Sequence, residues 1–185
     1  MSAEQLVKNC APTLAGIKTG SLYNLGSDTW QDAYPDIRKL NRLLSRKGLR
    51  IIPVKTMRGN ILIYVFRPQD LKKDLNCPIA KAMLNERGYD TSNADCCVAR
   101  LADRLRKGES FPHEIGFFLG YPAKDVRCFI EDPNRNLKCV GCWKVYSNEK
   151  RAKRLFEKYR LCTREFEKRY KNGSSLEQLV VSNCK

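Results

Sequence analysis

The sequence predicts an α+β fold in which a small antiparallel sheet is surrounded by helices. Two runs rich in β-branched residues, 49–55 and 60–66, are joined across the segment Thr-Met-Arg-Gly, a pattern typical of a β-hairpin. Most of the remaining chain carries apolar residues at three- and four-residue spacing, which indicates amphipathic helices. Because helical segments surround the one clear hairpin, we expect helices packed around a small sheet.

The first elements are expected to be a short helix over 3–9 and a brief strand within 16–25. Pro12 disfavours the helical conformation at Ala11 and suits the first turn of a new helix. Cys10 would then lie just ahead of a helix N-terminus. A helix over 28–47 follows, and Pro53 places the first hairpin strand at a sheet edge or at a bulge.

Further helices are expected over 68–87, with a break near Cys77–Pro78, over 92–107 and over 148–171. The run Leu-Lys-Cys-Val-Gly-Cys-Trp-Lys-Val-Tyr at 137–146 is strand-like. The last helix is expected to bury a periodic set of side chains: Ala152, Leu155, Phe156, Tyr159, Cys162, Phe166 and Tyr170.

Length and composition indicate one globular domain over 1–185. The chain has 185 residues and is 42% apolar, enough for one well-buried core. It has no apolar run of membrane-spanning length and no leader-like N-terminus, so we expect a cytosolic protein. The nine cysteines are an odd number and include the adjacent pair Cys96 and Cys97. That arrangement makes a poor disulfide framework and favours reduced thiols.

The chain carries 35 basic and 20 acidic residues, a formal charge of +15. Such an excess favours an anionic partner, which could be nucleic acid, an anionic surface or an acidic protein. The densest basic segment, 149–172, holds ten Lys and Arg residues against four Glu. A plain solvated helix face explains such a run equally well.

The segment 110–132 contains His113, the only histidine of the chain. Ser110 as a cap and Pro112 as a first helical residue predict a helix start, with His113 in its first turn. The positive end of the helix dipole disfavours the imidazolium there, which suits a general base. A second helix is expected to begin after Gly120 and Pro122, with Asp125 in its first turn. The alternative is a helical hairpin whose histidine only caps or packs.

Cys10 and His113 together form the first candidate constellation. A thiol at a helix N-terminus is activated by the dipole and free N–H groups, and an imidazole can shuttle its proton. The order and separation of the two residues are compatible with papain-type enzymes. Cys10 could instead be a small buried apolar residue.

Other residues could complete this constellation. Asp125 is the preferred carboxylate to orient the imidazole, and Glu114 is the alternative, because adjacent helical side chains do not face one another. Asp125 could equally be an ordinary first-turn carboxylate. Gln5 or Asn9, upstream of the cysteine, could supply an oxyanion-hole amide.

The pair Cys139 and Cys142 forms a C-x-x-C motif. This motif can be half of a zinc site or a redox pair. No second half accompanies it, since Cys128 and Cys162 stand alone and no histidine pattern is present. The aromatic residues of the basic last helix share its apolar face, so they are expected in the core and not as base-stacking platforms.

Three motifs carry a family resemblance: NCAPTLAGIKTGSLYNL, FPHEIGFFLGYPAKDV, and CWKVY followed by a basic helix. Together they resemble a family of domains of unknown function from anaerobic bacteria, and within it the papain-like cysteine transacylases of closthioamide biosynthesis. The resemblance implies a papain-like plan, with Cys10 as the nucleophile and His113 as its base. It departs from that plan at His113, because papain-type histidines usually lie on a strand.

The resemblance also implies an activity, namely transfer of an acyl group from a carrier-protein thioester to an amine or diamine through an acyl-cysteine. No metal or cofactor is expected, because a thioester is already activated. The basic surface would meet an acidic acyl or peptidyl carrier protein. Hydrolysis by the same residues is a close variant. The alternative from another class is a non-enzymatic basic adaptor that binds nucleic acid or an acidic protein.

Overall fold

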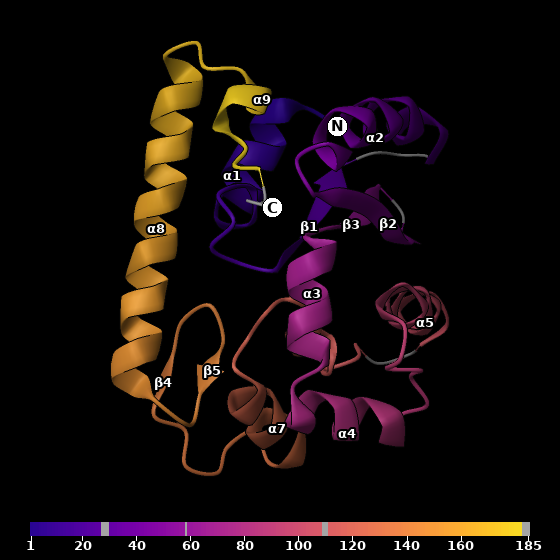
Figure 1. The fold of residues 1–185 in the computed structure, drawn as a ribbon, viewed down its shortest axis with the longest axis vertical. Helices are drawn as coiled ribbons and strands as arrows, with labels where there is room; N and C mark the ends of the chain where they lie inside the picture. Colours follow the sequence, from indigo (N-terminus) through magenta and orange to yellow (C-terminus); the bar gives the residue numbers. More distant parts are fainter. Residues whose placement is uncertain (27–29, 58, 109–110, 183–185) are drawn as a thin grey trace.

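The computed structural model describes residues 1–26, 30–57, 59–108 and 111–182. In chain order its elements are α1 (Ala3–Leu14), β1 (Gly20–Gly26), α2 (Trp30–Ser45), β2 (Arg50–Met57), β3 (Asn60–Phe66), α3 (Pro68–Leu75), α4 (Pro78–Glu86), α5 (Ala94–Lys107), α6 (Ile115–Phe118), α7 (Ala123–Glu131), β4 (Cys139–Val140), β5 (Lys144–Val145), α8 (Glu149–Lys171) and α9 (Leu176–Leu179). The α+β class is as predicted (Figure 1).

The main sheet has three antiparallel strands in the order β1-β3-β2. The predicted hairpin is confirmed as β2 and β3, and β1 pairs with the other side of β3. The register of β2 shifts between Pro53 and Lys55. Proline cannot donate to the strand ladder, so it lies where expected, on an edge strand and at an irregularity.

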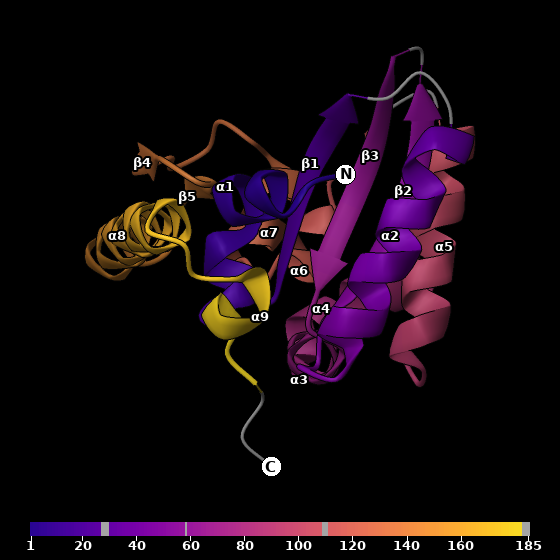
Figure 2. The ribbon, with the colours of Figure 1, turned by 90° about the horizontal axis from the view of Figure 1, so that it is seen from above.

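Helices cover both faces of this sheet (Figure 2). Ile61, Ile63 and Val65 of β3 belong to a core cluster that includes residues of α1, α2 and α9. The alternate residues Leu62, Tyr64 and Phe66 belong to a second cluster, formed with α3, α4, α5, α6 and α7. Since successive side chains of a strand point to opposite faces, the buried β3 separates the two halves of the core.

The prediction for the N-terminal segment was wrong in one respect. Helix α1 continues through Pro12 to Leu14, so Cys10 lies inside a helix and not ahead of one. A capping box between Ser2 and Gln5 starts the helix. Residues 10–14 are all buried, and this burial outweighs the loss of one hydrogen bond at the proline.

The run 137–146 also differs from its prediction. It forms the separate two-stranded hairpin β4–β5 and does not join the main sheet. Trp143 and Val145 pack instead against Ala152 and Tyr159 of α8 in a third core cluster. The hairpin therefore takes its position from α8, which runs along one side of the molecule (Figure 1).

The other helices agree with the periodicity, including the break between α3 and α4 at Cys77–Pro78. Helix α6 is shorter than expected. Pro112 and His113 precede it in a turn, whose carbonyls accept hydrogen bonds from Ile115 and Gly116. The cap proposed for Ser110 lies outside the described residues. Gly120 has a φ of +73°, and an added Cβ would lie 2.6 Å from Thr19 Oγ1, so the bend after α6 requires glycine.

Arg67 links several elements at the end of β3. Its side chain is fully buried and donates to the carbonyls of Thr13 at 2.7 Å and Leu14 at 2.8 Å. It also donates to the carbonyl of Val181 at 2.7 Å. Terminal carbonyls of a helix have no partner within the helix. The guanidinium therefore caps α1 and attaches the C-terminal segment to it.

Replacing Arg67 by methionine should destabilise the protein by about 3 kcal/mol or more, because several buried carbonyls lose their donor. Urea unfolding followed by circular dichroism measures the change. Arg50→Met is the control, since Arg50 makes an exposed ion pair with Asp95 that contributes at most about 1 kcal/mol. Equal losses in the two variants would contradict this role of Arg67.

Candidate functional site

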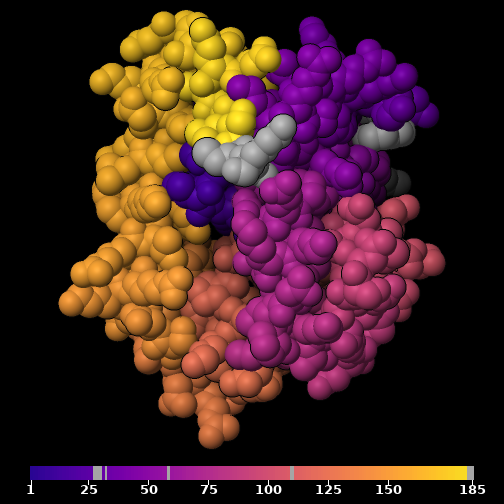
Figure 3. Space-filling view, in the orientation of Figure 1, coloured from indigo at the N-terminus to yellow at the C-terminus, as the bar shows by residue number. Residues whose placement is uncertain are grey.

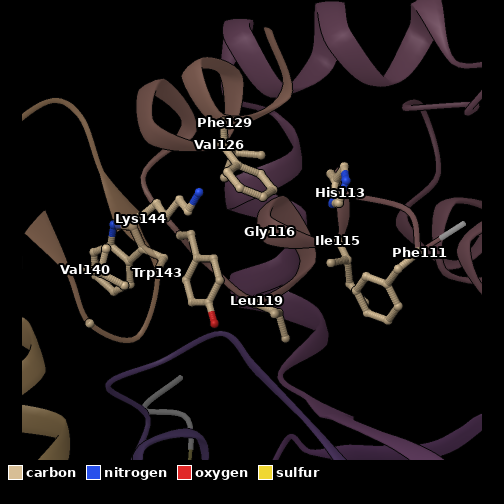
Figure 4. A pocket seen from close by; sticks show the side chains of 12 residues that line it. Phe111, His113, Ile115, Gly116, Leu119, Val126, Phe129, Val140, Trp143 and Lys144 are labelled. Carbon is tan, nitrogen blue, oxygen red and sulfur yellow. The ribbon is translucent and has the colours of Figure 1, made fainter. Parts of the chain in front are cut away.

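An apolar pocket of about 410 Å³ lies between the α6–α7 segment and the β4–β5 hairpin. Its wall is almost entirely carbon, and such concave apolar surfaces with few polar groups are typical of ligand sites. The lining residues come from three segments, 111–121, 126–129 and 140–144 (Figure 4). The lining residues are Phe111, His113, Ile115, Gly116, Leu119, Tyr121, Val126, Phe129, Val140, Gly141, Trp143 and Lys144.

His113 and Lys144 are the residues of this wall that can carry a positive charge, and they flank Phe129 (Figure 4). The imidazole meets the Phe129 ring edge-on, with 4.9 Å between the ring centroids. The Lys144 ammonium lies 5.5 Å from the centroid of the same ring. His113 is exposed, and no hydrogen bond to its ring occurs in the described part of the chain. The imidazole is therefore free to meet a ligand.

Aromatic stacking holds the hairpin side of the pocket. The Trp143 ring stacks on Tyr121, with centroids 5.1 Å apart, and meets Phe156 of α8 edge-on at 4.5 Å. Asp125 accepts a hydrogen bond from the Trp143 indole N–H at 2.8 Å. The pocket wall is thus built by contacts between α7, β5 and α8.

Asp125 is buried, and its carboxylate is used within the fold. Besides Trp143, it accepts hydrogen bonds from the backbone N–H groups of Tyr146 at 3.1 Å and Ser147 at 2.7 Å. Glu114 is also buried and accepts from the Tyr89 hydroxyl at 2.9 Å, while Arg104 Nε lies 3.0 Å from the same oxygen. Both carboxylates therefore make structural contacts, and in the described part of the chain neither is hydrogen-bonded to the imidazole.

Cys10 lies in the core on the other face of the sheet. It has no exposed surface and belongs to the cluster that includes Ile61, Ile63 and Val65. His113 precedes α6, whose residues pack in the opposite cluster. Burial raises the pKa of the Cys10 thiol to about 12, although Lys18 and a hydrogen bond with Ser21 act in the other direction. In this arrangement the thiol is protonated and covered.

Lys18 is the charged group that links the surroundings of Cys10 to the pocket. Its ammonium lies 5.4 Å from the centroid of Tyr121, which lines the pocket. Burial lowers the pKa of Lys18, and the nearby thiols Cys142 and Cys10 raise it. Lys18 is therefore close enough to both thiols for its charge to act on them, and it contacts a residue that lines the pocket.

The candidate oxyanion residues make local helix contacts. The Gln5 side-chain oxygen accepts from the Ser2 backbone N–H at 2.8 Å as part of the capping box. The Asn9 amide donates to the Gln5 carbonyl at 2.8 Å. Neither amide faces a cavity that also contains Cys10, because Cys10 is enclosed by the core.

The C-x-x-C pair spans the β4–β5 turn, with Cys139 half-buried and Cys142 exposed. Both are free thiols. Across residues 1–182, the gaps at 27–29, 58 and 109–110 aside, no group of three or more His, Cys, Asp or Glu side chains could hold a metal ion. The position of Cys142 beside Gly141 and Trp143 nevertheless brings a thiol to the edge of the pocket.

Sequence reasoning identified His113 but not the residues that build its pocket. Trp143 appeared only as part of a strand-like run. The signal that was available is the aromatic and glycine content of the segments Gly-Tyr-Pro at 120–122 and Gly-Cys-Trp at 141–143. Periodicity cannot indicate that these two segments meet, because their contact depends on the packing of the hairpin against α8.

These features define an α+β protein with an apolar pocket that presents one imidazole and one ammonium. The chain belongs to the family DUF3793, whose members are described as proteins of unknown function, and the family model matches residues 6–180. The predicted membership in a family of unknown function is thereby confirmed.

No curated protein and no solved structure matches this chain. The papain-like plan therefore stays a prediction. Among the described helices, none has both the length and the apolar character needed to cross a bilayer.

Cys10 should react far more slowly with iodoacetamide than Cys96, which is exposed. A pKa of about 12, against the ordinary thiol value of 9.0, lowers the thiolate fraction at pH 8 by about 1,000-fold, and burial blocks access as well. Alkylation of the folded protein at Cys10 should stay low until the pH approaches 12. Peptide mass spectrometry after timed alkylation measures both sites, and equal rates would contradict the covered thiol.

Asp125→Ala should lower the free energy of unfolding by about 3 kcal/mol, because three buried N–H donors lose their acceptor. Thermal unfolding followed by circular dichroism measures this loss. Glu131→Ala is a matched control on the same helix, where the exposed pair with Arg127 spans 3.8 Å and contributes little. A stable Asp125→Ala variant would return Asp125 to the set of candidate reacting groups.

Proposed function

We propose that this protein is an acyltransferase that holds the acyl chain of a thioester in the His113 pocket and transfers it to an amine. The observation that carries the proposal is the exposed imidazole of His113 on the wall of an apolar pocket of about 410 Å³. An imidazole is suited to proton transfer near neutral pH. An apolar wall is suited to an acyl chain.

The pocket wall suggests how the acyl group is recognised. Leu119, Val126 and Phe129 offer carbon surface and no hydrogen-bonding groups to a ligand. Each buried methylene contributes about 0.8 kcal/mol to binding. Affinity for thioesters should therefore rise with acyl chain length until the pocket is full.

In the simplest route, the amine attacks the thioester carbonyl directly. The new C–N bond forms as the C–S bond breaks, His113 takes the proton from the amine nitrogen, and that proton passes to the departing thiolate. Lys144, on the other side of Phe129, supplies a positive charge near the pocket that would favour the developing oxyanion. This route requires no acyl-enzyme.

A second route passes through an acyl-Cys10 intermediate, as the family resemblance implies. Here the Cys10 thiolate attacks the carbonyl, the donor thiol leaves, and the amine then displaces Cys10. The positive charge of Lys18 acts to lower the pKa of this thiol and supports the route. It requires that Cys10 and His113 approach each other, whereas in this structure Cys10 and α6 lie in core clusters on opposite faces of the sheet.

The finer form of the proposal names the substrates. The donor would be a thioester on an acidic carrier protein and the acceptor a small amine or diamine, as in closthioamide biosynthesis, an antibiotic pathway of anaerobic bacteria. The charge of +15 supports an acidic donor, since opposite charge accelerates encounter. Neither a metal nor another cofactor takes part in either route.

A specific observation favours a second function, that of a basic adaptor for nucleic acid or an acidic protein. All ten Lys and Arg side chains of α8 are exposed. Ion pairs with Glu149 and Glu157 engage Lys153 and Arg160. The remaining cations form a positive face along 23 residues of helix. If this face binds nucleic acid, the logarithm of the binding constant should fall linearly with the logarithm of the salt concentration.

The proposed activity is tested with acyl thioesters of increasing chain length and a diamine, with the amide measured by mass spectrometry. His113→Ala should reduce the rate of amide formation by about 100-fold. Intact-protein mass spectrometry of the same mixtures detects any acyl adduct, and the direct route predicts that Cys10→Ala retains activity. An adduct that Cys10→Ala abolishes would favour the second route.

Occupation of the pocket is measured separately. The variant Trp30→Phe leaves Trp143 as the single tryptophan, so its fluorescence reports the pocket wall during titration with the thioester. Affinity should increase by about 4-fold per methylene. A wild-type protein that neither forms amide nor changes its fluorescence with any chain length would refute the acyltransferase proposal.

A further inference from the structure

A second cavity, of about 560 Å³, lies beside the His113 pocket. It is bounded by the end of α3, the start of α4, the α6–α7 bend and the first turns of α8, and Figure 3 shows this face hollowed between α3 and α8. The residues that line it are Lys73, Asp74, Cys77, Ile79, Phe117, Gly120, Tyr121, Pro122, Ala123, Lys124, Ser147, Asn148, Arg151 and Leu155. Its wall combines a polar side with an apolar side.

Positive charge dominates the polar side of this cavity. Lys73, Lys124 and Arg151 line it from three different elements, against the single carboxylate of Asp74. Lys73 makes an exposed contact of 3.3 Å with Asp70. Within the described ranges, Lys124 and Arg151 have no ion-pair partner. Their charges are therefore available to an anion.

Asp74 offsets at most one of these three positive charges. The Thr19 hydroxyl donates a hydrogen bond to its carboxylate. Burial raises the pKa of Asp74, an effect that the bond from Thr19 opposes. The carboxylate is thus held beside Thr19, just ahead of β1, and the three cations line the cavity from α3, α7 and α8.

The backbone dipoles of nearby helix starts add to the positive potential of these side chains. Helices α4 and α7 both begin at this cavity, after Cys77 and Pro122, and neither start has a side-chain cap. Helix α8 begins there too, with Asn148 capping the Arg151 N–H. Free N–H groups at helix starts add positive potential. Together with the three cations, they give this cavity a positive potential that stabilises an anion.

We infer that this cavity binds the phosphate of a phosphate ester whose acyl-bearing end reaches the His113 pocket. A guanidinium such as that of Arg151 can form two parallel hydrogen bonds to phosphate, and the lysines add point charges. Ile79, Phe117 and Leu155 provide an apolar side for the carbon chain of the ester.

Tyr121 connects the two cavities, because its side chain lines both. A molecule with a phosphate at one end and an acyl thioester at the other can therefore contact both sites around this ring. Acylated phosphopantetheine has this chemistry. The assignment of the acyl end rests on the proposed function, whereas the phosphate site stands on the charges of its own cavity.

Calorimetric titration with 4′-phosphopantetheine and with pantetheine isolates the phosphate, since the two probes differ in that group alone. Wild-type protein should bind phosphopantetheine at least about 10-fold more tightly, as expected for two or more charge-assisted hydrogen bonds. The double variant Lys124→Gln/Arg151→Gln should lose this preference and keep its affinity for pantetheine. Circular dichroism checks its fold.

The matched control is Lys150→Gln/Arg154→Gln, which removes the same charge from exposed positions of α8 that do not line the cavity. It should leave the preference within about 2-fold of wild type, since long-range charge effects are screened by salt. Equal binding of the two probes, or an equal loss in both double variants, would overturn the inference. A failure of acyl transfer with the phosphate preference intact would remove only the proposed function.

Discussion

The buried guanidinium of Arg67 is the interaction on which the arrangement of the fold depends. It lies at the end of the central strand and donates to carbonyls at the end of α1 and to that of Val181 near the C-terminus. These carbonyls would be costly to bury without donors. Because one side chain donates to all of them, it fixes the positions of β3, α1 and the C-terminal segment relative to one another. The position of α8 follows, since it packs along α1.

Helix α8 in turn positions the pocket. Phe156 and Tyr159 of α8 pack against Trp143 of the β4–β5 hairpin. Asp125 of α7 accepts a hydrogen bond from the Trp143 indole N–H. The sheet keeps the two predicted catalytic residues apart. It separates the cluster that contains Cys10 from the cluster that contains α6 and α7, next to His113. The geometry thus favours chemistry centred on His113 and its apolar wall, with Cys10 as part of the core.

The two cavities differ in the kind of chemical group that each can bind. The His113 pocket is mostly apolar and includes His113 and Lys144, while the neighbouring cavity combines three cations with helix N-termini. Tyr121 lines both, so that in the proposed complex an apolar group and an anionic group of one ligand would meet matching surfaces. The basic face of α8 begins at the edge of the second cavity, where Arg151 belongs to both. A large acidic partner and a small anionic ligand would therefore be attracted to the same side of the molecule.

Much of the fold could be read from the sequence, and the site could be read only in part. The β2–β3 hairpin, the irregularity at Pro53, the break at Cys77–Pro78 and the inward face of α8 all follow from local rules of periodicity and proline geometry. Burial of residues 10–14 overrode such a rule at Pro12 and placed Cys10 inside a helix. By itself, the sequence determined the elements, the charge and the single imidazole. Only the tertiary structure decided which side chains surround that imidazole, because contacts between distant segments depend on packing and not on local preference.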